Sequence, residues 1–234
     1  MRERPDKNVS LSFFRLMKGE TYLTQDGSSS LRHSVLGDSY HSEGGAVSEA
    51  LHVYVAAGFD SIEQRQIAIF EMGFGTGLNC ALTLQRAEQR NVIVDYHSVE
   101  LYPIDAETVS GLNYFAEDAE MRAMFESLHN AQWGESVQIA ENFTLTKYHD
   151  SLERVKPNRE FDLIYFDAFA YDTQPELWSR EVFEQMAAMT KSGGVLVTYS
   201  SKGVVKQALR EAGFEVRRLP GACGKHHMLR AVKL

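Results

Sequence analysis

Cysteine is scarce in this 234-residue chain, and so are long apolar runs. Its two cysteines, Cys80 and Cys223, lie far apart and form no Cys-x-x-Cys pair. This scarcity argues against a disulfide framework or a zinc site and fits a reducing cytoplasm. No apolar run approaches the length needed to cross a bilayer, and the first residues lack the apolar core of a secretion signal. We therefore expect a cytoplasmic protein with no membrane partner.

Positive charge is also in short supply. The chain has 24 Lys and Arg against 32 Asp and Glu, a formal net charge of −8. Phosphate binding draws on Lys and Arg, so this balance argues against a nucleic-acid partner, although a local basic patch can act within an acidic protein. The eight histidines are scattered. The adjacent pair His226 and His227 would point to opposite faces of a strand, so we expect no metal site.

The most informative stretch runs from residue 67 to residue 79. Its four apolar residues from 67 to 70 predict a buried strand, and the spacing of apolar residues after Gly77 predicts a helix. Between them, Gly73, Gly75 and Gly77 allow the backbone to approach a ligand closely. A buried strand, a glycine turn and a helix together form the nucleotide-binding corner of an α/β fold.

The spacing of the glycines indicates which ligand binds. The order is Gly-x-Gly-x-Gly after Glu71, whereas the dinucleotide fingerprint is Gly-x-Gly-x-x-Gly. The form with a preceding acid resembles motif I of class I S-adenosylmethionine (SAM) methyltransferases, whose ligand carries an ammonium and a sulfonium. Glu100, at the end of the next expected strand, is placed to accept hydrogen bonds from ribose hydroxyls. A purely structural turn and a solvated carboxylate remain the alternatives.

The rest of the chain alternates strands with helices, which predicts a mainly parallel sheet. Residues 214–219 and 228–233 predict a closing antiparallel pair. Near the start, Asp26-Gly27 between two strand-like runs predicts a hairpin. A helix over residues 46–57 follows, with Gly58 as its expected C-cap, and apolar residues between 11 and 17 predict a short packed element. We expect an N-terminal extension over residues 1–58 and a SAM-binding domain over residues 59–234.

Two further acids, Asp150 and Asp167, fall at expected strand ends, where ligands of such sheets bind. Asp150 is placed to receive the adenine amino group, although a turn-capping role is equally compatible. Asp167 lies next to the expected position of the sulfonium. Phe169, Tyr171 and Trp178 follow it and could stack a flat or cationic substrate or belong to the core; for Trp178 we favour the core.

Several separated segments match a known family, in order and over most of the chain. They are residues 24–28, 40–46 with Glu49, 71–79, 167–170 with 174–178, 193–199, 209–214 and 224–230. The chain resembles the bacterial tRNA wobble-uridine methyltransferases of the MnmD type, which also form the N-terminal half of the bifunctional MnmC enzymes. It departs from the family pattern at Tyr171, where proline is usual, and at His226-His227, where Arg-Glu is usual.

The resemblance implies a Rossmann-like class I SAM-dependent methyltransferase fold. It implies methyl transfer from SAM to the primary amine of 5-aminomethyl-uridine, usually 2-thiolated, at the tRNA wobble position. It implies SAM contacts from Tyr40, from the glycine loop with Asn79, and from Glu100 and Asp150, with Asp167 facing the substrate amine. The flavin-dependent oxidase half of the fused enzymes has no counterpart here, so we expect a separate enzyme to supply the aminomethyl substrate.

Such a transfer requires the amine lone pair to be aligned with the S–CH₃ bond. Asp167 could orient the amine and stabilise the growing positive charge, but an ordinary Asp pKa near 4 gives little power to deprotonate an ammonium. If RNA is the substrate, cations should gather on one face. The candidates are Lys202, Lys206, Arg210, Arg217, Arg218, Lys225 and Arg230, of which we assign Lys225 and Arg230, with Phe169, to the substrate site.

Three other functions remain open. A SAM methyltransferase acting on a small molecule keeps the fold and cofactor but needs no basic face. An NAD-dependent oxidoreductase is disfavoured by the glycine spacing. A non-catalytic scaffold with the same fold is disfavoured by the presence of both Glu100 and Asp167.

Overall fold

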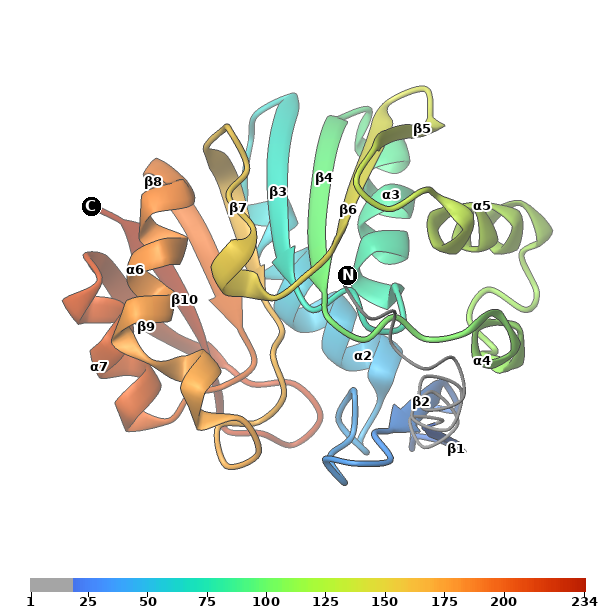
Figure 1. The fold of residues 1–234 in the computed structure, drawn as a ribbon, viewed down its shortest axis with the longest axis horizontal. Helices are drawn as coiled ribbons and strands as arrows, with labels where there is room; N and C mark the ends of the chain where they lie inside the picture. Colours follow the sequence, from blue (N-terminus) through green and yellow to red (C-terminus); the bar gives the residue numbers. More distant parts are fainter. Residues whose placement is uncertain (1–18) are drawn as a thin grey trace, which may run out of the picture.

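The computed structural model describes residues 19–234, which build one eight-stranded sheet with helices on both faces (Figure 1). The strand order is β5-β6-β4-β3-β7-β8-β10-β9. The parallel strands are β3 (Gln66–Met72), β4 (Ile93–Glu100), β6 (Phe143–His149), β7 (Phe161–Phe166) and β8 (Thr190–Thr198). The antiparallel strands are β5 (Ser136–Ala140), β9 (Phe214–Pro220) and β10 (His227–Lys233). The predicted parallel sheet and closing antiparallel pair are confirmed.

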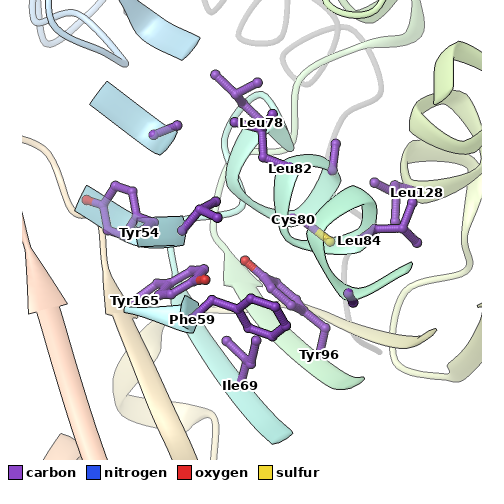
Figure 2. Packing of buried hydrophobic residues seen from close by; sticks show 14 of the residues in the cluster. Tyr54, Phe59, Ile69, Leu78, Cys80, Leu82, Leu84, Tyr96, Leu128 and Tyr165 are labelled. Carbon is purple, nitrogen blue, oxygen red and sulfur yellow. The ribbon is translucent and has the colours of Figure 1, made fainter. Parts of the chain in front are cut away.

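Each face of the sheet buries its own apolar core. One face of the sheet is covered by α3 (Leu78–Arg90), α4 (Ala106–Gly111) and α5 (Ala119–Asn130). The other face is covered by α6 (Arg180–Met189) and α7 (Gly203–Glu211). Because both faces are covered, the central strands are largely buried, and all six residues of β7, including Asp162, are buried. Figure 2 shows part of the α3 side, where Tyr54, Tyr96 and Tyr165 pack around Phe59.

The N-terminal segment confirms the predicted hairpin and helix. Strands β1 (Glu20–Leu23) and β2 (Ser29–Arg32) pair antiparallel. Helix α2 (Ala46–Ala50) continues as a π-helical segment, η1 (Leu51–Ala56). The prediction for Gly58 is wrong, because its φ of −96° is not left-handed. A Cβ there would lie 2.5 Å from the Tyr54 carbonyl oxygen, so close packing explains this glycine. The apolar element expected between residues 11 and 17 lies outside the described residues.

The order of the strands determines where a ligand can bind. Strand β3 pairs with β4 on one side and with β7 on the other. The sheet therefore grows from β3 through β4 in one direction and, later in the chain, through β7 in the other. In an open α/β sheet, a crevice forms at such a point, beyond the carboxyl ends of the strands. Within residues 19–234, no helix is both long and apolar enough to cross a membrane. The same residues contain no group of three or more His, Cys, Asp or Glu side chains that could hold a metal ion.

Candidate active site

A cavity of about 570 Å³ opens beyond the carboxyl ends of β3, β4 and β7. This volume lies in the range of small-molecule sites, roughly 300–1,000 Å³. Its wall includes residues of the segment 36–43, which follows β2, together with the glycine loop and the loop between β9 and β10. The predicted site residues that line it are Tyr40, Gly73, Gly75, Asn79, Glu100, Asp150, Asp167, Phe169 and Lys225.

Three other predicted site residues, Glu71, Gly77 and Arg230, lie off the cavity wall. Glu71 is fully buried and accepts a hydrogen bond of 2.8 Å from the Ser98 hydroxyl. Burial raises the pKa of this carboxyl to about 8. Glu71 therefore supports the loop from below as a largely protonated acid, because a fully buried side chain does not reach a ligand in the cavity.

Gly77 and Arg230 are placed by other contacts. Gly77 precedes α3 with a φ of +73°, and a Cβ there would lie 2.8 Å from His129 Nε2. Its glycine identity is explained by that conformation and that close approach. Arg230 lies on β10 opposite Arg217, half-buried, and its buried Nε has no hydrogen-bond partner among the described residues.

The other two loop glycines bring backbone close to neighbouring groups. Gly73 has a φ of +88°, and a Cβ there would lie 2.7 Å from the Asp167 carbonyl oxygen. Gly75 has a φ of +50°, and a Cβ there would lie 3.2 Å from the Tyr40 ring. Larger residues would therefore separate the ends of β3 and β7 or push Tyr40 away from the loop.

Glu100 joins the glycine loop to the end of β4. Its Oε2 accepts a hydrogen bond of 3.0 Å from the Gly75 N–H, and its Oε1 accepts one of 2.8 Å from the Tyr102 N–H. Burial raises its pKa, while these backbone donors lower it. A carboxylate has about four lone-pair sites. Glu100 therefore keeps acceptor capacity for the hydroxyl groups of a ligand.

The N-terminal segment closes one side of the cavity with aromatic rings. Tyr40 and Phe169 pack edge to face with centroids 5.1 Å apart. Asp38 fixes this arrangement, because its Oδ2 accepts hydrogen bonds from the Ala170 N–H at 3.1 Å and from the Thr173 hydroxyl at 2.8 Å. The loop after β7 is thus tied to a segment more than a hundred residues earlier in the chain.

Asp167, at the end of β7, is the most perturbed acid on the cavity wall. Its Oδ1 accepts a hydrogen bond of 2.6 Å from the Tyr54 hydroxyl, and its Oδ2 accepts one of 2.8 Å from Asn79 Nδ2. Burial raises its pKa to about 7, against the lowering effect of these two donors. The expectation of an ordinary pKa near 4 is wrong, because the carboxyl is desolvated. Asp167 can both hold and accept a proton near neutral pH.

A second carboxylate lies on the same side of the cavity. Glu49 is 6% exposed; its Oε2 accepts from the Ser42 N–H at 2.8 Å and its Oε1 from Lys225 Nζ at 2.5 Å. Lys225 Nζ also lies 4.6 Å from the centroid of the Tyr199 ring. The charge of Glu49 raises the pKa of Asp167 further, and the charge of Lys225 lowers it.

Asp150 lies at a place that is compatible with both of its predicted roles. Its Oδ1 accepts a hydrogen bond of 2.8 Å from the Ser151 N–H, which is a turn-capping contact. It also lines the cavity, in the loop that joins β6 to η3 (Leu152–Arg154). The geometry leaves its second oxygen available to a ligand amino group.

Sequence reasoning missed Tyr54 and Asp38 and gave Glu49 no role of its own. Tyr54 stands in the apolar stripe of a helix, where a tyrosine indicates packing, and its hydroxyl partner is 113 residues away. Asp38 belongs to a polar loop that contains several similar residues. Trp178 is 1% exposed and donates to the Phe169 carbonyl, which confirms its core position.

Several groups on the cavity wall that have hydrogen-bonding capacity left over fit the polar groups of SAM. Asn79 lines the wall, is 4% exposed, and its Oδ1 has no hydrogen-bond donor among the described residues. An unsatisfied buried acceptor suits a ligand that brings N–H donors, such as an α-ammonium group. Glu100 offers acceptors for a ribose diol, and the Gly73–Gly75 backbone leaves room for close approach.

Comparison with known proteins agrees with this site. Residues 117–234 match a family model described as S-adenosyl-L-methionine-dependent methyltransferase. The tRNA 5-methylaminomethyl-2-thiouridine biosynthesis bifunctional proteins MnmC of Ralstonia nicotianae and Burkholderia multivorans are 33% and 34% identical to the chain, over 82% and 92% of its length. The matches cover 31% and 35% of these relatives, so the chain spans about a third of their length.

A solved structure extends the likeness to the whole described fold. The crystal structure of MnmC2 from Aquifex aeolicus superposes with a TM-score of 0.77 at 25% identity and covers 99% of this chain and 77% of that one. The shared fold is a mainly parallel sheet with an N-terminal hairpin and a C-terminal antiparallel pair. The chain therefore belongs to the S-adenosyl-L-methionine-dependent methyltransferases and is a relative of the MnmC proteins.

Proposed function

We propose that this chain methylates the primary amine of 5-aminomethyl-uridine, with or without a 2-thio group, at the wobble position of tRNA. The observation that carries the proposal is Asp167, a desolvated carboxyl on the wall of the cavity beside the glycine loop. The names of the MnmC relatives supply the substrate class. We also propose that a separate enzyme supplies the aminomethyl substrate.

SAM supplies a methyl group already activated on a sulfonium. The glycine loop, Glu100 and Asn79 hold and orient the cofactor, with Tyr40 and Asp150 at the wall beside them. Asp167 accepts a hydrogen bond from the acceptor amine and directs its lone pair to the methyl carbon. Because its pKa is about 7, Asp167 also takes the proton that an ammonium must lose before attack. Tyr54 and Asn79 hold the two carboxyl oxygens in place.

The test is mass spectrometry of wobble nucleosides after the protein is incubated with SAM and tRNA. The tRNA comes from cells that make aminomethyl-uridine but do not methylate it. The expected result is a gain of one methyl group on aminomethyl-uridine, dependent on SAM. Unchanged tRNA, under conditions in which calorimetry shows SAM binding, would contradict the tRNA substrate and leave the family assignment intact.

A small cationic amine is the second candidate acceptor, and one observation favours it. Glu153 and Glu176 line the cavity and add negative charge around it, whereas Glu43 on the same wall is paired with Arg32. Such a rim attracts a free amine and repels RNA phosphate. Methylation of a small amine, while tRNA that carries 5-aminomethyl-uridine stays unmethylated, would support this alternative.

A further inference from the structure

An acidic cavity leaves open how an RNA substrate would be held, and the distribution of charge along the chain offers an answer. Residues 201–234 contain eight Lys and Arg and two Glu, a formal charge of +6, within a chain of net charge −8. The first 200 residues therefore carry −14. Such a charge asymmetry within one chain is a recognised sign of nucleic-acid binding.

The structure sorts the seven cations expected on an RNA face. Lys202 pairs with Asp172, Arg217 pairs with Glu215, and Lys225 is held by Glu49 on the cavity wall. Arg230 is half-buried in the sheet. The remaining three, Lys206, Arg210 and Arg218, form what we name the α7–β9 cluster.

The α7–β9 cluster has no carboxylate partner among residues 19–234. Lys206 and Arg210 are one turn apart on α7, and Arg218 lies on β9, which packs beside that helix. The charge of Arg210 lowers the pKa of Lys206, and that of Arg218 lowers it further, so the three cations lie close enough to repel one another.

The acids of this segment do not relieve the repulsion. Glu211 accepts a hydrogen bond of 2.9 Å from Gln207, and Glu215 pairs with Arg217 at 2.8 Å. Elsewhere in the described structure, Arg159 and Arg180 have an acid partner, whereas the exposed Arg65 and Lys156 also have no ion pair. In an acidic protein, three adjacent cations without partners suit an external polyanion.

The cluster is also connected to the cavity. Lys202 precedes the first turn of α7 and pairs with Asp172, in the loop that follows Asp167. The loop that follows β9 carries Lys225 on the cavity wall. In Figure 1, α7 and β9 lie together at the C-terminal edge of the sheet. A polyanion bound on this edge therefore lies beside segments that also contribute to the cavity wall.

Resting on the proposed function, we infer that the α7–β9 cluster of Lys206, Arg210 and Arg218 binds the phosphate backbone of the tRNA whose wobble base enters the cavity. The backbone supplies several phosphates at regular spacing, which three cations on one edge can contact together. None of the three lines the cavity, so their contribution is to docking and not to the transfer step.

The test compares two triple variants that lose equal charge. The first is Lys206→Gln, Arg210→Gln and Arg218→Gln. The control is Arg65→Gln, Lys156→Gln and Arg159→Gln, three exposed or partly exposed cations outside the C-terminal segment. Filter binding of unmodified tRNA across a salt series gives affinity and its salt dependence, and steady-state assays on aminomethyl tRNA give kcat and KM.

The cluster variant should bind tRNA at least tenfold more weakly at about 0.1 M salt, and its slope of log affinity against log salt should fall by about 2, at roughly 0.7 per lost phosphate contact. Its KM for tRNA should rise while kcat and SAM affinity stay unchanged. The control should match wild type. Equal tRNA affinity of the two variants at all salt concentrations would overturn the inference.

Two further outcomes separate the inference from the proposed function. If the wild-type protein methylates tRNA and the cluster variant binds tRNA as tightly as wild type, only the docking surface is contradicted. A wild-type protein that neither binds nor methylates tRNA contradicts both. Polyglutamate that displaces tRNA as strongly as unmodified tRNA does, at equal charge concentration, would assign the surface to polyanions in general and also overturn the inference.

Discussion

The two halves of the cavity are built in different ways. The cofactor half consists of the glycine loop and Glu100, whose contact with Gly75 joins residues 25 apart through a backbone N–H. The acceptor half is built from side chains that meet from distant segments. Tyr54 and Asp167 are 113 residues apart, and Glu49 and Lys225 are 176 apart.

This difference separates two kinds of function. Backbone donors and glycine conformations provide a rigid cradle whose properties depend little on neighbouring side chains. In the proposed mechanism the acceptor half instead controls a proton, because burial and nearby charges set the pKa of Asp167. Variants in the first half should therefore alter affinity for SAM, and variants in the second should alter rate and its pH dependence.

The largest effect is expected for Asp167→Asn. Loss of the proton-accepting carboxyl should reduce methylation by about 10² to 10⁴-fold while SAM affinity, measured by calorimetry, stays close to that of wild type. Asp172→Asn is the matched control, because Asp172 lies in the same loop but off the cavity wall. Near-normal turnover of Asp167→Asn would show that the acceptor half does not depend on this carboxyl.

A smaller effect, on SAM affinity and not on the rate, is expected for Glu100→Gln. A hydrogen bond to a charged group contributes about 1.5–3 kcal/mol, so SAM should bind roughly 10 to 100-fold more weakly. The value of kcat at saturating SAM should be retained, since Glu100 is not part of the acceptor half. A change in kcat with unaltered SAM affinity would break the comparison between the halves.

The smallest effect is expected for Tyr54→Phe and appears in the pH profile. The Tyr54 hydroxyl stabilises the Asp167 carboxylate, so its loss should raise the pKa of Asp167 and move the acid limb of the rate profile upward. At about 1.4 kcal/mol per pH unit, one lost hydrogen bond predicts a shift of about one to two units. Activity should fall near pH 7 and recover toward pH 9.

Tyr165→Phe is the control for that prediction. Tyr165 is also fully buried and lies beside Tyr54 (Figure 2), with ring centroids 5.2 Å apart. Its hydroxyl contacts Thr83 and not Asp167. Its removal should leave the pH profile unmoved. Equal profiles for both variants would mean that Tyr54 contributes only packing.

Local patterns brought Gly73, Gly75 and Glu100 to one cavity, although Glu71 and Gly77 lie off its wall. The spacing of the loop glycines and the position of Glu100 placed these residues around one cavity, because a strand, a turn and a helix are defined by near neighbours. The same local reasoning failed at Gly58, where a glycine after a helix suggested a left-handed cap. A Cβ at Gly58 would also lie 3.0 Å from Val197 and 3.1 Å from Tyr165, and these tertiary neighbours could not be seen from the sequence.

The acceptor half resisted prediction for a different reason. The position of Asp167 followed from topology, but its pKa did not, because desolvation depends on what packs around the carboxyl. Tyr54 gave no signal, since a tyrosine and a phenylalanine fit the same helical stripe. Among the cations, the sequence offered seven equivalent candidates, and the ion pairs, with the burial of Arg230, distinguished the α7–β9 cluster from the rest.

The sequence by itself determined the parallel sheet, the glycine corner and the acids at the strand ends, because burial periodicity and backbone freedom are properties of short segments. Only the tertiary structure decided which acid is desolvated, which hydroxyl holds it, and which cations lack a partner. These properties arise from electrostatic and packing interactions, some of them between residues more than a hundred positions apart, and such interactions exist only after the chain has folded.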